Sequence, residues 1–299
     1  MTDLHLPDIQ AGTPERQYRL SRVGVRGVRK PVIVSRAGRK PVTLTADFDI
    51  FVDLPAHQKG VHMSRNLEAV AELIDERIAE PVPSLEALVS RLAAVLLEKH
   101  PYAKMSEVRA VGDYFLQREF PGGGKSVEPY RLIAEGRAER TNGGPPTVKK
   151  LIGVEVIGMT ACPCAMETSR ALLKARGIAV PDQGPVITHN QRNVATLLLE
   201  VPQHAEVEAD DLVDLVESCL SAPTYELLKR KMEGELVVRA HDKPMFVEDV
   251  VREILDKVAA RYTKLPADTH VVARSEAHES IHKHNAFAER VTTLAQLRA

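Results

Sequence analysis

Residue types that could ligate a metal ion gather in the second half of this chain. Cys162-Pro163-Cys164 offers two thiols, His189 lies in Thr188-His189-Asn190-Gln191-Arg192, and Glu233 follows Leu228-Lys229-Arg230. Thiolate, imidazole and carboxylate are the ligand types that zinc and other borderline divalent metals accept. We expect one Cys, one His and one Glu to hold the metal, with water in the fourth position. Three protein ligands plus water is the catalytic pattern, because the metal lowers the pKa of that water to about 7.

Further titratable groups follow along the chain. Glu248 falls near the edge of the apolar face of a predicted helix, where partial desolvation would suit a general acid. His282 and His284 come after Glu279, at what we predict to be the end of the last strand. Because residues two apart share one face of an extended chain, the two histidines could act as a proton-transfer pair or as ligands.

Each of these features also has an ordinary structural explanation. A structural zinc site usually closes with four ligands from Cys-x-x-Cys knuckles, whereas this chain has Cys-x-Cys. The two thiols could be inert in a tight turn, and the carboxylates and histidines could be solvated surface groups. The spacing alone therefore leaves a metal hydrolase and a structural metal-binding protein both open.

The elements that must position these residues follow from hydrophobic periodicity. Alternation over Val42–Leu54 predicts a half-buried strand, after a basic N-terminal arm with an early strand. Helical patterns, separated by Pro81 and Pro83, and further strands complete the prediction. The predicted helices are Leu67–Ala79, Leu85–Lys99, and helices around residues 212–220 and 246–258. The other predicted strands are Ser106–Leu116, Val148–Met159, Val194–Val201 and Thr269–Arg274. Cys219 lies on an apolar stripe, so we expect a buried core thiol.

Residues 121–147 are rich in Gly and Pro at both ends and are the best candidate for a boundary. Gly124-Lys125-Ser126 resembles part of a phosphate-binding loop, but that pattern needs a glycine where Glu119 stands. We therefore expect an exposed loop. The sequence predicts an α+β chain of two similar modules, residues 1–147 and 148–299, each with strands and paired helices.

The composition is that of an ordinary globular protein, with 299 residues, 44% apolar residues and a net charge of −1. The near-zero charge and scarce aromatics argue against nucleic-acid binding, and no apolar stretch is long enough to span a membrane. Three cysteines do not make a disulfide framework. Without a secretory apolar segment near the start, we expect a cytoplasmic protein.

Taken together, the motifs resemble the type IB GTP cyclohydrolases, the metal-dependent family that includes the archaeal-type enzymes. The similarity runs nearly end to end. It is carried by Arg22-Val23-Gly24-Val25, Phe51-Val52-Asp53-Leu54-Pro55, Gln58-Lys59-Gly60, His62-Met63-Ser64-Arg65, Thr160-Ala161-Cys162-Pro163-Cys164, Thr188-His189-Asn190-Gln191-Arg192, Tyr225-Glu226-Leu227-Leu228-Lys229-Arg230, Phe246-Val247-Glu248-Asp249 and Glu279-Ser280-Ile281-His282-Lys283-His284.

The resemblance implies a tunnelling fold with two modules per chain, antiparallel sheets with paired helices, and chains associated into an oligomeric barrel. It further implies a homo-oligomer, a homotetramer by expectation, with active sites at subunit interfaces. The family opens the imidazole ring of GTP, releases C8 as formate and recloses the skeleton into a dihydropterin. One divalent metal per subunit is implied, and Fe²⁺, Zn²⁺ and Mn²⁺ all tolerate this ligand set.

The resemblance also implies roles for individual residues. Cys162, His189 and Glu233 correspond to the metal ligands, with Cys164 a close neighbour and an alternative sulfur. Glu248 would position or deprotonate the attacking water, and His282 and His284 would transfer protons. Glu279 would anchor the N–H edge of guanine, since a carboxylate accepting two parallel N–H bonds selects guanine over adenine. The candidates for binding the triphosphate are Arg65, Arg192, Lys229 and Arg230.

Two departures and two alternatives accompany this assignment. The family often has Pro-Asp-Glu where this chain has Lys231-Met232-Glu233, and His189 follows Cys164 by 25 residues, a spacing that resembles the archaeal-type branch. That branch forms a 2′,3′-cyclic phosphate product, and the bacterial branch a triphosphate. The alternatives are an NADPH-dependent nitrile reductase of the same fold, disfavoured by the His189 and Glu233 pair, and a non-enzymatic metal-binding protein.

Overall fold

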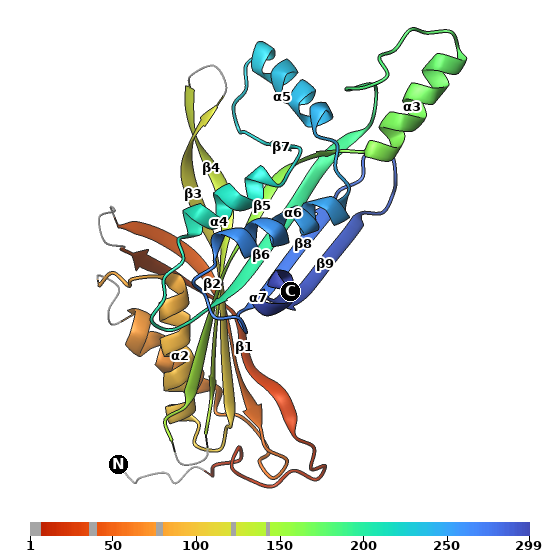
Figure 1. The fold of residues 1–299 in the computed structure, drawn as a ribbon. Helices are drawn as coiled ribbons and strands as arrows, with labels where there is room; N and C mark the ends of the chain where they lie inside the picture. The colour runs from red at the N-terminus through yellow and green to blue at the C-terminus, as the bar shows by residue number, and fades with distance from the viewer. Residues whose placement is uncertain (1–6, 36–40, 76–79, 121–123, 142–143) are drawn as a thin grey trace. The chain divides into compact units, whose positions relative to one another are not determined.

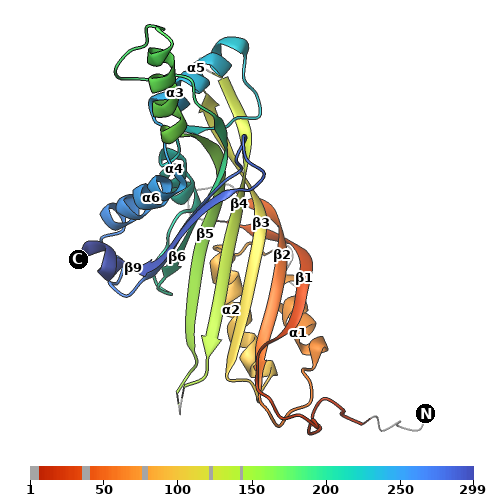
Figure 2. The same cartoon turned by 90° about the vertical axis from the view of Figure 1, so that its right-hand side faces the viewer.

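The computed structural model describes residues 7–35, 41–75, 80–120, 124–141 and 144–299. In this part of the chain the strands form a nine-stranded sheet in the order β1-β2-β3-β4-β5-β6-β8-β9, with the short β7 paired to β5 (Figures 1 and 2). The strands are β1 (Leu20–Val34), β2 (Val42–Leu54), β3 (Met105–Phe120), β4 (Gly124–Glu139), β5 (Thr147–Ala161), β6 (Asn190–Val201), β7 (Ala222–Pro223), β8 (His270–Ala277) and β9 (Ala286–Thr293). The helices are α1 (Met63–Val70), the π-helical η1 (Ala71–Asp75), α2 (Leu85–Lys99), α3 (Pro163–Ala175), α4 (Ala209–Ser218), α5 (Arg230–Asp242), α6 (Val247–Arg261) and α7 (Leu294–Arg298).

The chain divides into two compact units, and neither is one continuous stretch. The first unit comprises residues 1–113, 133–151 and 202–205, and the second comprises the remainder. The long strands β3, β4 and β5 each contribute residues to both units. A single cut after residue 147 therefore does not describe the compact units, and a repeat of two modules, 1–147 and 148–299, stays a prediction.

The first unit is built on the alternating pattern of β2. Its inward side chains, among them Phe48 and Ile50, are fully buried, and β2 pairs antiparallel with both β1 and β3. Helix α2 begins at its N-cap Ser84 and packs closely on the sheet, where the Ser106 hydroxyl of β3 donates to the Ala93 carbonyl. Gly136 permits this approach, since a Cβ there would lie 2.4 Å from the backbone of α2.

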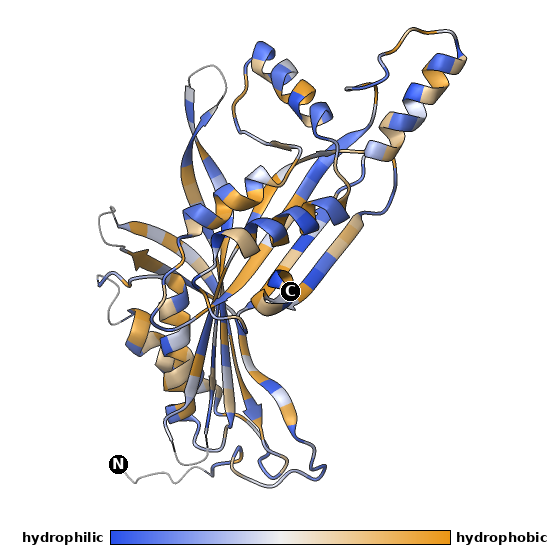
Figure 3. Cartoon of the chain, viewed as in Figure 1, coloured by the Kyte–Doolittle hydropathy of each residue, from blue (hydrophilic) through white to orange (hydrophobic). Residues whose placement is uncertain are grey.

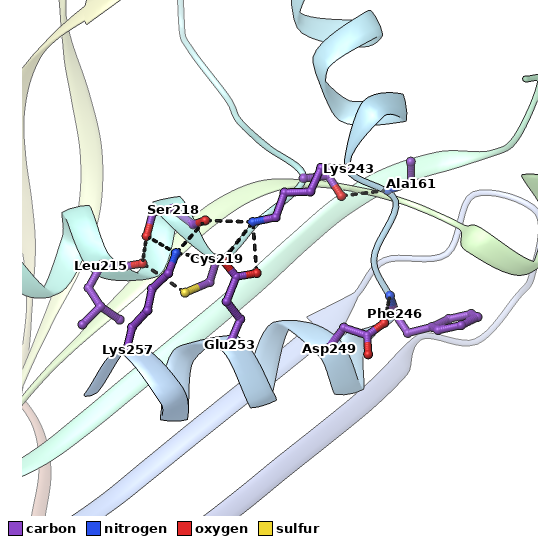
Figure 4. A network of polar contacts seen from close by, with 10 residues as sticks. Ala161, Leu215, Ser218, Cys219, Lys243, Phe246, Asp249, Glu253 and Lys257 are labelled. Atoms are coloured by element: carbon purple, nitrogen blue, oxygen red, sulfur yellow. Dashed lines mark hydrogen bonds and ion pairs between the residues drawn. The ribbon is translucent and has the colours of Figure 1, made fainter. Parts of the chain in front are cut away.

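The core of the second unit lies where α4 and α6 cover strands β6 and β8. Both helices are amphipathic, and Figure 3 shows hydrophobic and hydrophilic residues alternating along α6. Cys219 is fully buried just after α4, as predicted, and its thiol donates to the Leu215 carbonyl. Burial raises the pKa of this thiol to about 11. Beside it, Lys243 and Lys257 bond to the Ser218 carbonyl and pair with Glu253, which ties α4 to α6 (Figure 4).

Several elements depart from the expectations. The strand β2 and the helix α2 have the predicted bounds, whereas β4, α3, α5, β9 and α7 were not predicted. Gly124-Lys125-Ser126 begins strand β4, so the prediction of an exposed loop there is wrong. The helix expected over Leu67–Ala79 instead begins at Met63 and continues into η1, and residues 76–79 lie outside the described part. Across the described ranges, no helix is both long enough and apolar enough to cross a membrane.

Candidate active site

Cys162 and His189 come together at one place in the second unit, although 27 positions separate them. Cys162 follows β5 and caps α3, with Pro163 at the first helical position, where its missing N–H is harmless. The Cys162 sulfur accepts a hydrogen bond from the Ala165 N–H at 3.4 Å. The backbone N–H of Cys162 donates to the His189 carbonyl at 3.0 Å, and the Thr188 hydroxyl donates to the Cys162 carbonyl at 2.7 Å. The thiol and the imidazole are therefore carried by directly hydrogen-bonded segments.

A chain of polar side chains orients the His189 ring. Nδ1 of His189 lies 2.9 Å from Oε1 of Gln191 and 3.6 Å from Oε2 of Glu279. Nε2 of Gln191 donates to Oε1 of Glu279 at 3.5 Å and to the Thr160 hydroxyl at 3.3 Å. The side chains of His189 and Glu279 are each only 12% exposed. The structure thus brings two predicted residues, His189 and Glu279, into one network.

The N-terminus of α6 also reaches this region. The Met245 N–H donates to the Ala161 carbonyl at 2.9 Å, directly before Cys162, and the Phe246 N–H bonds to Asp249 in the first turn (Figure 4). Glu248 lies in that same first turn. Its side chain is exposed in the chain, so the partial desolvation expected of it is not seen here.

Glu233 lies on α5 and does not reach the Cys162–His189 pair. It occupies the first turn of α5 and is exposed, as are Lys229 and Arg230 beside it. The other end of α5 approaches the site, where Nε2 of His241 lies 3.4 Å from the Thr188 carbonyl. Eight residues at a rise of 1.5 Å separate Glu233 from His241 by about 12 Å along the helix axis. Accordingly, the described residues of one chain contain no group of three His, Cys, Asp or Glu side chains arranged to hold a metal ion.

His282, His284 and Cys164 are all exposed. The two histidines lie in the loop between β8 and β9, so the expectation that they end the last strand is wrong. Their rings stack at a centroid distance of 5.1 Å with an interplanar angle of 10°. Cys164 lies in the first turn of α3. Within the described part of the chain, none of these three residues has a hydrogen bond or ion pair with His189 or Glu279.

The predicted phosphate-binding cations belong to both compact units. Arg192 lines a cavity of about 340 Å³ in the second unit, a volume at the lower end of the range for small-molecule sites. In the wall of that cavity the Tyr130 hydroxyl donates to Glu217 at 2.5 Å, and burial raises the pKa of both groups. Arg65 belongs to the first unit, where its guanidinium donates to the Lys99 carbonyl at 3.3 Å.

Three residues of the site were given no role from the sequence. Gln191 and Thr160 stand inside the quoted motifs, but without coordinates nothing showed that their side chains meet. His241 was missed because α5 is polar and contains Gly234, which hides its helical period. The usable signal was the two-residue spacing at the start of β6, which places His189 and Gln191 on the same face of an extended chain.

The donor chemistry around Cys162 and His189 fits a borderline divalent cation. A neutral histidine that donates from Nδ1 keeps a lone pair on Nε2, which is the usual arrangement of a metal-ligating histidine. A thiolate and an imidazole are two of the ligands that such a cation takes. One chain supplies these two donors and a polar network behind the imidazole, and the third predicted donor lies elsewhere on the chain.

Comparison with known proteins agrees with the sequence motifs. Residues 6–288 match the family model GCHY-1, described as type I GTP cyclohydrolase folE2. The chain is 43% identical over 303 residues to GTP cyclohydrolase MptA of Methanobrevibacter smithii, covering 98% of this chain and 97% of that protein. It is 40% identical to GTP cyclohydrolase MptA of Methanothermobacter thermautotrophicus, covering 98% and 95%.

Solved structures with a similar fold are urate oxidases. A highly active mutant of Bacillus sp. TB-90 urate oxidase superposes with a TM-score of 0.53 at 9% identity, covering 92% of this chain and all of that chain. A uricase from Bacillus fastidious gives a TM-score of 0.50 at 11% identity, covering 95% and 96%. At these identities the similarity concerns the fold alone.

Proposed function

The chain belongs to the type I GTP cyclohydrolase family, and from this membership we propose how its residues act on GTP. It is a GTP cyclohydrolase of pterin biosynthesis. The observation that carries this conclusion is the full-length similarity to the methanogen GTP cyclohydrolases. In the proposed reaction, water adds at C8 of guanine, the imidazole ring opens, C8 leaves as formate, and the skeleton recloses into a 7,8-dihydroneopterin phosphate. The product is either the triphosphate or, with release of diphosphate, the 2′,3′-cyclic phosphate.

In this proposal Cys162, His189 and Glu233 hold one divalent cation per subunit, either Fe²⁺, Zn²⁺ or Mn²⁺. A cation so bound supplies a Lewis acid that activates water at neutral pH. Support comes from the hydrogen-bonded segments that carry Cys162 and His189 and from the polar network behind the imidazole. Cys164, two positions from Cys162, is the alternative sulfur.

The remaining residues bind the nucleotide and move protons. Glu279 accepts the N–H edge of guanine, and its low exposure favours such a charge-assisted bond. Glu248, in the first turn of α6, orients the attacking water, and His282 and His284 exchange protons with the ring nitrogens during opening and closure. The positive charges of Arg65, Arg192, Lys229 and Arg230 neutralise the triphosphate.

We further propose that the chain forms a homotetramer of tunnelling-fold subunits, with barrels closed between subunits and active sites at their interfaces. One observation supports this assembly. Several predicted site residues, Glu233, Glu248, His282 and His284, stand exposed on the single chain. An interface would place such residues against the Cys162–His189 segments of another subunit.

The test is anaerobic incubation of the purified protein with GTP and one defined metal at a time. Formate release and mass analysis of the pterin would establish the reaction, the metal and the product together. A nitrile reductase of the same fold would consume NADPH and release no formate. Absence of formate with every metal would contradict the proposal.

A further inference from the structure

We infer that Gln191 is a positioning residue that fixes the tautomer of His189, and that Glu279 enforces this arrangement through Gln191. The inference rests on the proposed function, because it concerns the imidazole that we propose as a metal ligand. It adds a second task for Glu279, which would control the metal-binding nitrogen of His189 as well as recognise guanine.

The direction of each hydrogen bond follows from the ionised carboxylate of Glu279. An ionised carboxylate can only accept, so Glu279 must receive a proton from the Nε2 amide of Gln191 at 3.5 Å. The Gln191 amide is thereby oriented with Oε1 toward His189, and that oxygen can only accept. Nδ1 of His189, at 2.9 Å, must therefore carry the proton. A neutral ring protonated at Nδ1 has its lone pair on Nε2, the atom left to bind a cation.

Burial gives this network its strength. Gln191 is 9% exposed and Thr160 is 1% exposed, so water competes weakly for their polar atoms. A hydrogen bond in such surroundings is electrostatically stronger than in water, and a reversed amide would place the Gln191 oxygen against the Glu279 carboxylate, an acceptor facing an acceptor. The Thr160 hydroxyl does not determine the direction, because a hydroxyl can donate or accept. Among the described residues of this network, Glu279 is therefore the group that fixes the direction of the hydrogen bonds.

The test combines two measurements on the full-length protein. The first is the tautomer of His189 in metal-free protein with ¹⁵N-labelled histidine, read by NMR at a pH where the imidazole is neutral and assigned by loss of the signal in His189→Ala. The second is the affinity for Zn²⁺ alone, by competition with a chromophoric chelator. Removal of a residue that supports a metal ligand typically weakens metal binding about 10- to 100-fold.

Four variants separate positioning from simple packing. Gln191→Leu should bind Zn²⁺ about 10- to 100-fold more weakly and lose the single Nδ1–H tautomer. Gln191→Glu keeps an acceptor for Nδ1 and should retain that tautomer. Glu279→Gln can donate as well as accept, so it should release the Gln191 amide. It also removes a negative charge 3.6 Å from Nδ1 of His189, and both changes should weaken Zn²⁺ binding. Thr160→Val, the packing control, removes a bond of the Gln191 amide that sets no direction, so it should keep the Nδ1–H tautomer of His189.

The outcomes are distinct. Unchanged Zn²⁺ affinity and unchanged tautomer in both Gln191→Leu and Glu279→Gln would overturn the inference. Equal damage from Thr160→Val would also overturn it, because packing would then explain the effect. If the unmodified protein binds none of the proposed metals, the metal part of the proposed function fails, and the tautomer comparison on metal-free protein still decides the role of Gln191. If Gln191→Leu fails to fold, Gln191→Glu and Glu279→Gln provide the answer.

Discussion

Acidification should destabilise the first unit through a single buried histidine, His100. The residue follows α2 and is fully buried, with Nε2 at 2.7 Å from the Asn66 side-chain oxygen and Nδ1 at 2.8 Å from the Tyr102 hydroxyl. Burial, together with the positive charges nearby, lowers the pKa of His100 to about 4. Those charges belong to Arg65, His62 and Lys99.

The sign and size of the effect follow from linkage. An unfolded histidine titrates near pH 6.5, so the unfolded chain takes up a proton before the folded chain does. The stability contributed by neutral His100 is therefore complete above about pH 6.5 and is lost as the pH falls toward 4. A folded pKa of about 4 against 6.5 corresponds to a loss of about 3 kcal/mol in the free energy of unfolding.

The assay is urea unfolding at a fixed protein concentration, at pH 7.5 and at pH 4.5, for the unmodified protein and for His100→Gln. Glutamine cannot titrate, so the difference between the two proteins isolates the His100 contribution from that of the carboxylates. We expect the unmodified protein to lose about 2–3 kcal/mol more than the variant over this interval. An equal loss in both proteins would refute the reasoning.

Three further predictions concern the thiols and the glycines. Cys162→Ala should reduce formate release from GTP by at least about 100-fold while circular dichroism shows an intact fold, since loss of a ligand should exceed the effect of losing a supporting residue. The comparison is Cys164→Ala, which should lose less activity. Normal turnover by Cys162→Ala after metal reconstitution would contradict the prediction. A chromogenic thiol reagent should label Cys219 only in denaturant, because Cys219 is fully buried. Fast labelling of Cys219 in native protein would disprove this. In thermal unfolding, Gly136→Ala should lower the free energy of unfolding by about 1–3 kcal/mol, because its Cβ would lie 2.4 Å from the backbone of α2. Gly234→Ala has open space around it in α5 and should raise the free energy of unfolding by about 0.5–1 kcal/mol. Equal effects of the two substitutions would be inconsistent with the packing described.

Periodicity predicted the elements that bury one clean face. The strand β2 alternates without interruption, and α2 has an N-cap serine and an apolar stripe, so their bounds could be predicted from sequence. The strand β4 was hidden because glycines precede it and Pro129 interrupts its pattern. The helix α3 could have been predicted from Cys162 as N-cap and Pro163 at the first position, a signal that the metal-ligand interpretation of the same residues obscured.

The residue types of the site were proposed from the sequence, and the structure tests only part of their geometry. The motifs assigned Cys162 and His189 to one metal site, and the structure shows a backbone hydrogen bond between their segments, while their role as ligands stays a prediction. No local pattern could show that Gln191 links His189 to Glu279, because that contact joins segments 88 positions apart. The position of Glu233 relative to the thiol depends on the assembly of subunits, which spacing along one chain does not encode.

The central claim is that Cys162, His189 and Glu233 bind a single divalent cation in the assembled oligomer. Its most direct test is anomalous diffraction from crystals of the Zn²⁺-loaded protein. We expect one peak per subunit, about 2.3 Å from the Cys162 sulfur and about 2.0–2.1 Å from Nε2 of His189, with a Glu233 carboxylate completing the protein ligands. Peaks bound to other residues, or three side chains with no shared cation, would contradict it.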